Sequence, residues 1–422
     1  MRWTVGRIVK QGLRFVCGIA MATQLAACGG GSGSGSEASI PPTPPPPATR
    51  FFATASMSTA RAYHTATLLQ NGTVLVTGGT DVNGKALASA EIFDPFNDRF
   101  TPTGDMVSAR TYHSATLLQD GRVFLDGGDE TGTKELFDPS SKTFTPIGTA
   151  TGKTAGLNAA LRNDGVVVVR GPAITVCQPS TGCATGGAAI VLFDPLAGSF
   201  TSPGGSPGHA FLDQTMTLLE DDRLLVAGGR IGTRVSYTNG TSEVRDLSVN
   251  TAELVDPERG TARPTANISA RHAHAAALLD DGRVLIAGGM HSYQDAIAPV
   301  QSVTLADAEL FDPVSETFKA TGRMQTARQE HAMTRLTSGA VLVTGGTGAS
   351  GQRLGTAELF DPTTGTFESM GSMVSVRSGN RYSPLAGNPS TGYSATALKD
   401  GRALIVGGIS NGAPVATAEL FQ

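Results

Sequence analysis

The chain has 422 residues and a net charge of −4, and it contains 53 glycines but only 17 phenylalanines, 6 tyrosines and 1 tryptophan. An acidic chain without a basic cluster argues against nucleic acid as a partner. Many glycines with few aromatic residues suit a turn-rich all-β protein built on small and β-branched side chains.

Residues 1–27 have the residue order of a secretory signal. Four basic residues come first: Arg2, Arg7, Lys10 and Arg14. An apolar run follows from about Phe15, too short and too interrupted for a spanning helix. The signal ends in Leu25-Ala26-Ala27-Cys28, which resembles the bacterial lipobox and implies that Cys28 is lipidated. Ordinary cleavage beside an incidental cysteine is the alternative. Removing four basic residues and no acid would take the net charge from −4 to −8.

Residues 28–50 are expected to form a tether. Gly29 to Ser36 is a flexible Gly/Ser run, and prolines then stiffen the chain towards polyproline. With a lipid at Cys28, this segment predicts a membrane partner and a bacterial cell-envelope location. Gly29, which is not acidic, follows the cysteine. By resemblance to Gram-negative sorting signals, that favours the outer membrane or the cell surface.

Residues 51–422 consist of one repeated unit, seen most clearly from Arg110 to Phe144. Two apolar runs flank Asp120-Gly121, a double glycine ends the second run, and a third run ends in Asp138-Pro139. Asn-Gly or Asp-Gly between apolar runs predicts a hairpin with a type I′ turn. The unit therefore predicts four short antiparallel strands, here named A to D. It occurs seven times in all, with a period near 50 residues.

Such repeats predict a β-propeller. The RxxH, L-V-x-G-G and E-L-F-D-P elements resemble the motif of kelch repeats, which implies a seven-bladed kelch-type propeller over 51–422 and says little about activity. The last unit ends at Gln422 before any strand D, whereas Arg50-Phe51 precedes the first unit with the spacing of a strand D. We therefore expect a monomer whose last blade is closed by the N-terminal strand. Six blades with a loose third unit is the alternative.

The third unit is the most degenerate. It has Thr154, Leu157 and Val191 at the Arg, His and Glu positions, and it lacks the double glycine. Its B–C loop contains Cys177 and Cys183. Two nearby cysteines outside the cytoplasm usually pair, so we expect a disulfide rather than a metal pair.

An Arg-x-x-His element on strand A and a glutamate on strand C recur through the units. The set is Arg61, His64, Glu91, Arg110, His113, Glu135, Arg271, His274, Glu309, Arg328, His331 and Glu358. Four imidazoles near the channel mouth suggest a metal or anion site. Repetition at fixed positions favours structural partners within each blade, because buried polar groups must be paired. We expect no metal, no cofactor and no catalytic residue among them.

The run Arg-x-Tyr-His-Ser at Tyr112-His113 also resembles the copper-ligand strand of the galactose oxidase family. That family needs a second histidine from an added domain and a tyrosine crosslinked to a cysteine. The chain offers neither within the repeats, and the Tyr-His pair occurs twice, as repeat residues do. A copper radical oxidase or another glycan-active enzyme is therefore the alternative function.

The length of the connections varies between units on one face only, the face of the B–C and D–A connections. The long ones are the B–C loops of units four and five and the insertion at 378–392. Long loops on a rigid scaffold are usually functional, although tolerated insertions are the simpler interpretation. The candidate ligand residues are Arg230, Arg234, Tyr237, Arg245, His291, Tyr293 and Asp295. Aromatic, amide and charged groups of this kind suit sugar or peptide contacts. We expect a tethered binding module for a glycan, a peptide or a protein.

Overall fold

A computed structural model describes residues 51–149, 158–171, 175–178, 182–185, 190–205, 208–209, 211–236, 242–294, 299–377 and 392–422. The predicted signal, Cys28 and the tether lie outside these residues, as do Tyr237, Asp295 and the insertion at 378–391. The side chains of Arg234, Arg245 and the two cysteines of the third unit also lie outside the description. No helix in the described part of the chain is long and apolar enough to cross a bilayer.

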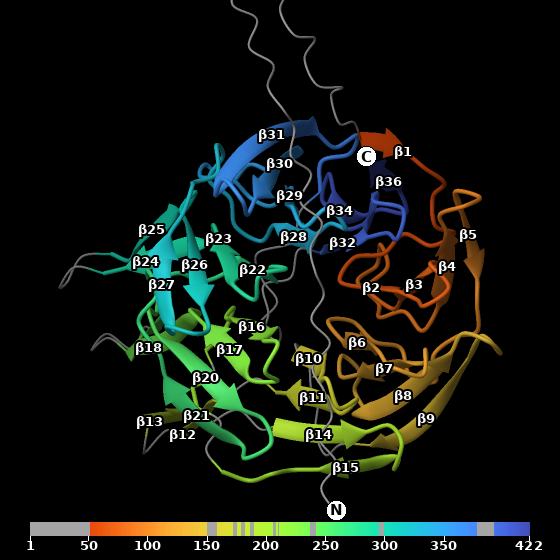
Figure 1. Cartoon of the computed structure of the whole chain (residues 1–422), viewed down its shortest axis with the longest axis horizontal. Helices are drawn as coiled ribbons and strands as arrows, with labels where there is room; N and C mark the ends of the chain where they lie inside the picture. Colours follow the sequence, from red (N-terminus) through yellow and green to blue (C-terminus); the bar gives the residue numbers. More distant parts are fainter. Residues whose placement is uncertain are drawn as a thin grey trace, which may run out of the picture. The chain divides into compact units, whose positions relative to one another are not determined.

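Seven four-stranded antiparallel sheets follow one another around a ring, so the predicted seven-bladed β-propeller is confirmed (Figure 1). Blade one comprises β2 (Thr65–Leu68), β3 (Val74–Thr77), β4 (Ala90–Asp94) and β5 (Arg99–Pro102). Blade two comprises β6 (Ser114–Leu117), β7 (Val123–Asp126), β8 (Thr133–Asp138) and β9 (Thr143–Thr149). Blade three comprises β10 (Asn158–Leu161), β11 (Val167–Arg170), β14 (Ile190–Asp194) and β15 (Ser199–Thr201), so the degenerate unit is a true blade.

The remaining four blades repeat this order. Blade four comprises β16 (Thr215–Leu218), β17 (Leu224–Ala227), β20 (Ala252–Asp256) and β21 (Thr261–Pro264). Blade five comprises β22 (Ala275–Leu278), β23 (Val284–Ala287), β26 (Ala308–Asp312) and β27 (Thr317–Ala320). Blade six comprises β28 (Ala332–Arg335), β29 (Val341–Thr344), β30 (Thr356–Asp361) and β31 (Thr366–Ser372). Blade seven comprises β32 (Tyr393–Ala397), β33 (Ala403–Gly407), β36 (Ala418–Phe421) and, as its outer strand, β1 (Phe51–Ala53).

The ring closes through the two ends of the repeat region. β1 pairs antiparallel with β36, with Phe51 opposite Phe421 and Ala53 opposite Glu419. The two rings of that first pair lie 5.1 Å apart between centroids. In Figure 1 the red start of the propeller lies beside its dark-blue end. Closure removes the sheet edge that β36 would otherwise expose.

The A–B turns differ from the predicted type I′ geometry. Gly72 has a φ of 88°, but Asn71 does not have a positive φ. Gly72 N–H donates to Leu69 O at 3.0 Å, and Leu69 N–H donates to Thr73 O at 2.8 Å, so the loop has three residues and only its last is left-handed. Asn71 Oδ1 instead accepts from Thr73 N–H at 3.1 Å. The motif thus needs the Asn or Asp as a hydrogen-bond acceptor.

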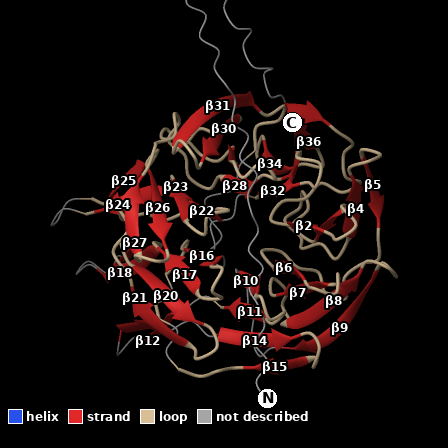
Figure 2. Cartoon of the chain, viewed as in Figure 1, coloured by secondary structure: helices blue, strands red, loops and turns tan. Residues whose placement is uncertain are grey.

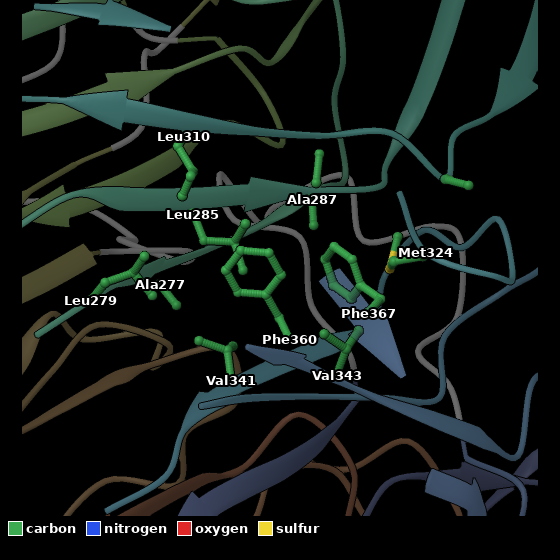
Figure 3. Packing of buried hydrophobic residues seen from close by; sticks show 12 residues of the cluster. Ala277, Leu279, Leu285, Ala287, Leu310, Met324, Val341, Val343, Phe360 and Phe367 are labelled. Carbon is green, nitrogen blue, oxygen red and sulfur yellow. The ribbon is translucent and has the colours of Figure 1, made fainter. Parts of the chain in front are cut away.

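The hydrophobic core lies between the blades, because each sheet covers the face of the next. Strand B of every blade is fully buried. Between blades five and six, Leu285 and Leu310 pack against Val341, Phe360 and neighbouring side chains (Figure 3). The aromatic of strand D packs on the strand C phenylalanine, as in Phe360 and Phe367 at 4.8 Å.

Four B–C connections form short two-stranded hairpins of their own, which the sequence did not predict (Figure 2). They are β12 (Thr175–Gln178) with β13 (Gly182–Thr185), β18 (Arg230–Ser236) with β19 (Ser242–Ser248), β24 (Met290–Tyr293) with β25 (Gln301–Thr304), and β34 (Ile409–Ser410) with β35 (Ala413–Pro414). The face of the ring that carries these hairpins and the D–A connections is called the hairpin face below. The face that carries the A–B and C–D turns is called the turn face.

Candidate functional site

Each motif arginine lies fully buried against the glutamate of its own blade. Arg61 donates to Glu91 Oε1 at 3.0 Å and to Gly78 O at 2.8 Å, so one guanidinium joins strand C to the end of strand B. Glu91 also accepts from Ser58 N–H at 2.8 Å, which fixes the D–A connection. The same contacts recur for Arg110, Arg271, Arg328 and Arg377. Because these donors and acceptors are used internally, the guanidinium groups are not directed at a ligand.

Three of the four motif imidazoles bond to the preceding blade and not within their own blade, which corrects our expectation. His113 Nε2 lies 3.0 Å from Thr65 Oγ1 and 2.9 Å from Thr77 Oγ1, both in blade one. His274 Nε2 lies 2.9 Å from Thr215 Oγ1 of blade four. His64 Nε2 lies 3.0 Å from Ser394 Oγ of blade seven. We call these contacts between neighbouring blades inter-blade joints. In each of them, the histidine of one blade contacts the residue that follows the histidine position in the preceding blade.

The double glycine is the other half of this joint. Gly79 N–H donates to Arg110 O of the next blade at 2.9 Å. A Cβ on Gly78 would lie 2.5 Å from the same carbonyl and 2.8 Å from His113 Cε1. Gly78 and Gly79 also have φ values of 63° and 95°, which favour glycine. No larger residue would let the next blade approach this closely.

His331 departs from the pattern. Residues 275 and 287 of the preceding blade are alanines, so no hydroxyl stands where Thr65 and Thr77 stand in blade one. Neither ring nitrogen has a hydrogen-bond partner among the described residues. Burial, together with Arg328, lowers the pKa of His331 to about 3. Burial, together with Arg61 and Arg377, does the same to His64. These imidazoles are neutral at physiological pH.

The Tyr-His pairs do not fit the copper site that the sequence resemblance implies. His64 and His113 are buried and hydrogen-bonded to neighbouring hydroxyls, as described above. The rings of Tyr63 and Tyr112 stack on each other with centroids 4.3 Å apart. Both tyrosines have left-handed backbones, with φ of 59° and 54°. Within the described ranges, no three His, Cys, Asp or Glu side chains come together as a metal-binding group.

Blade four shows how its glutamate is satisfied without the motif arginine. Phe211 and Gln214 stand at the Arg and His positions. Glu253 accepts instead from His209 N–H at 2.9 Å and pairs with His209 Nδ1 at 2.5 Å. Arg170 of blade three donates to His209 O. Arg170 of blade three thus holds the D–A connection that the motif arginine holds in the blades that have one.

On the hairpin face, blades four and five carry two neighbouring ribbons. Arg230 at the base of β18 pairs with Asp213 Oδ2 at 2.5 Å and with Asp246 Oδ1 at 2.6 Å. Asp213 belongs to the D–A connection and Asp246 to β19. Arg230, one of the predicted ligand residues, therefore fixes the ribbon to the ring through Asp213 and joins its two strands through Asp246.

The second ribbon presents a mixed aromatic and amide surface. His291 lies opposite Val303 in register, and Tyr293 lies opposite Gln301. Alternate residues of a strand and their register partners share one side of the ribbon. The His291 and Tyr293 rings lie 5.1 Å apart, tilted by 42°. Val303 is 50% exposed. This surface, named the β24–β25 surface, brings together two of the predicted ligand residues.

A serine and a histidine that the sequence analysis missed fix the two ribbons to each other. Ser248 Oγ of β19 lies 2.8 Å from His272 Nδ1 and accepts from Ser292 N–H at 2.8 Å. Ser292 Oγ in turn lies 2.8 Å from Ser302 Oγ across the β24–β25 pair. The only sequence signal was the additional histidine in Arg271-His272-Ala273-His274. The β24–β25 surface is held rigid from beneath.

In the third unit, Cys177 and Cys183 are direct partners in the β12–β13 register. Directly opposed residues of an antiparallel pair lie within the Cα separation that a disulfide requires. The expected disulfide stays a prediction, since the side chains are not described.

Comparisons with known proteins agree with this geometry at the level of the fold. Among solved structures, the chain is similar to a fungal alcohol oxidase of the AA5 family in complex with copper, with a TM-score of 0.66 over 89% of this chain and 76% of that one. The likeness concerns the β-propeller fold. The propeller is also similar to YjhT, with a TM-score of 0.52 over 74% of this chain and 98% of that one. Both are 14% identical to it, a level that shows the fold alone. No family model and no curated protein matches the chain.

Proposed function

We propose that the protein is a membrane-tethered binding module of the bacterial cell envelope that holds its ligand on the hairpin face of blades four and five. The observation that supports this most is the β24–β25 surface, where His291 and Tyr293 stand beside Gln301 and Val303 on a ribbon fixed from below. A tilted pair of rings beside an amide offers stacking and hydrogen bonding together. A glycan or an extended peptide is the ligand class that suits such a surface.

The rigid support argues against a merely tolerated insertion. Arg230 holds the first ribbon to the ring through Asp213, and Ser248 joins the first ribbon to the second. Insertions without a role need no such fixing, whereas a binding surface gains affinity when it is preorganised.

The tether part of the proposal rests on the sequence of the first 50 residues. It is tested by fractionating cells that express Cys28→Ala. We expect the variant to leave the membrane fraction. Membrane association equal to that of the wild type would show that lipidation at Cys28 is not the anchor.

The ligand part is tested with glycan, peptidoglycan and peptide arrays, followed by affinity measurements on point variants. His291→Ala and Tyr293→Ala should each weaken binding about tenfold or more, since interface aromatic residues often contribute above 1 kcal/mol. Val107→Ser is the matched control, because Val107 is 59% exposed and lies in the D–A connection of blade two. Unchanged affinity in both aromatic variants would place the site elsewhere. Stoichiometric copper in purified protein would favour the oxidase instead.

A further inference from the structure

Three apolar side chains stand almost fully exposed on the turn face. Phe96 is 95% exposed, and Leu196 and Val314 are each 93% exposed. Each follows the proline of an Asp-Pro pair, so they occupy one position in the C–D turns of blades one, three and five. Apolar groups at such turn tips contribute nothing to the core. The same position carries Ser140, Glu258 and Thr363 in blades two, four and six, so the apolar tips are a feature of alternate blades.

The backbone beneath these tips is held on both sides. Asp94 Oδ1 accepts from Phe96 N–H at 2.9 Å, and Arg402 of blade seven donates to Pro95 O at 2.6 Å. Asp194 and Asp312 accept from Leu196 and Val314 in the same way, each at 2.9 Å. Arg122 and Arg223 reach the proline carbonyls of blades three and five at 3.5 Å. The turn face therefore presents three apolar tips at fixed positions around the ring.

Three A–B turns of this face neutralise their own charges locally. Arg122, Arg283 and Arg402 pair with the aspartate two residues earlier at 2.7, 2.6 and 2.8 Å. Paired charges neither attract nor repel a distant surface strongly. The carboxylates beneath the tips accept backbone N–H groups instead, so the turn face keeps some negative charge around its apolar tips.

The chain enters the propeller on this same face. β1 begins at Phe51, opposite Phe421 at the end of β36, and strand C of each blade ends at the turn face. The 23 residues from Cys28 to Phe51 span at most about 80 Å when fully extended, so the tether alone leaves either face within reach of a bilayer. The three tips, together with the point of entry, select the turn face.

We propose that the turn face of the propeller docks on the lipid bilayer through Phe96, Leu196 and Val314, which directs the hairpin face away from the membrane. The proposal rests on the lipid anchor of the proposed function. It commits to the bilayer surface as the occupant, because the expected tether joins the propeller at Phe51, which lies at this face. A second copy or a partner protein on the tips would be a different outcome of the test.

The test uses the full mature lipoprotein reconstituted in phosphatidylethanolamine–phosphatidylglycerol vesicles. Trp3 is the only tryptophan and lies in the expected signal, so Phe96→Trp creates a single-tryptophan mature chain. Val303→Trp is the matched control, because Val303 is 50% exposed on the hairpin face. Lipids with brominated acyl chains quench an indole that enters the bilayer. We expect at least threefold stronger quenching for Phe96→Trp than for Val303→Trp, and the same for Leu196→Trp.

Equal quenching at the two faces, or stronger quenching at position 303, would overturn the docking proposal. Unquenched tips in a protein that sediments as a dimer would assign the turn face to a second copy instead. Flotation of the wild-type protein with the vesicles reports the anchor independently of the tips. A chain that does not float contradicts the lipid anchor, whereas a floating chain with unquenched tips contradicts only the docking face.

Discussion

The inter-blade joints differ in one respect that can be measured. His113 bonds to two hydroxyls of the preceding blade, whereas His331 has no partner among the described residues. Replacing each by leucine is a matched pair of perturbations. The chain itself has Leu157 at this position of unit three. The two variants change the same position in the repeat and remove the same group.

The two substitutions should change the free energy of unfolding in opposite directions. His113→Leu removes two buried hydrogen bonds, but Thr65 Oγ1 and Thr77 Oγ1 remain bonded to each other at 2.8 Å. We therefore expect a loss of about 1–2 kcal/mol in the free energy of unfolding. His331→Leu removes a buried ring whose nitrogens are unpaired, and such groups cost about 1–3 kcal/mol. It should be neutral or stabilising by about 1 kcal/mol.

Urea unfolding at pH 7.5 measures both values. A further variant supplies the partner that His331 lacks. Ala275 occupies the position in blade five that Thr215 occupies in blade four, and Thr215 Oγ1 lies 2.9 Å from His274 Nε2 of the next blade. Ala275→Thr should add about 1 kcal/mol in the wild-type background and nothing in the His331→Leu background. The reasoning would be refuted if His331→Leu cost as much as His113→Leu, or if the threonine stabilised both backgrounds equally.

Three further expectations follow from the same contacts. The pKa values of His64 and His331 are lowered to about 3, so below pH 6.5 the unfolded chain binds protons that the folded chain does not. The free energy of unfolding should therefore fall from pH 6.5 towards pH 3, by up to about 1.4 kcal/mol per pH unit for each ring. The His64→Leu variant should show a shallower dependence of this free energy on pH. Arg110→Met leaves Glu135 buried without its cation and should cost about 3–5 kcal/mol in urea unfolding, with an exposed control such as Arg259→Met near zero. Deleting residues 51–53 exposes the edge of β36 and should lower the thermal midpoint by several degrees and promote aggregation; an unchanged midpoint would contradict the closure.

The sequence predicted the blades well because the repeat encodes turns and strand faces locally. Closure was also predictable, since the spacing from Phe51 to His64 copies that from Phe100 to His113. The A–B turn type was wrong because the Asp-Gly pair has two different uses. In a type I′ turn both residues of the pair have left-handed backbones. In the turns of this chain the Asp or Asn side chain accepts a hydrogen bond, and only the glycine that follows it is left-handed. Composition does not distinguish these uses.

The direction of the imidazoles was missed for another reason. Strand periodicity indicates which face a side chain occupies but not which neighbouring blade it reaches. The sequence did contain a signal between units. Unit three lacks the double glycine, and unit four has Phe211 and Gln214 for Arg and His, so the two halves of one joint are absent together. The ribbons of the hairpin face, and the Ser248–His272 contact beneath them, depend on packing between blades that no single repeat specifies.

The pairing of β1 with β36 also bears on how the protein is made. Phe51 is synthesised long before Phe421, so β1 has no partner until nearly the whole repeat region has been made. Until then the outer strand of the last blade is an exposed segment that can pair wrongly. If Cys28 carries the proposed lipid, its attachment before the ring closes would keep this end fixed at the membrane while the rest of the chain folds. The last step of folding would then be the pairing of β36 with β1, which closes the ring.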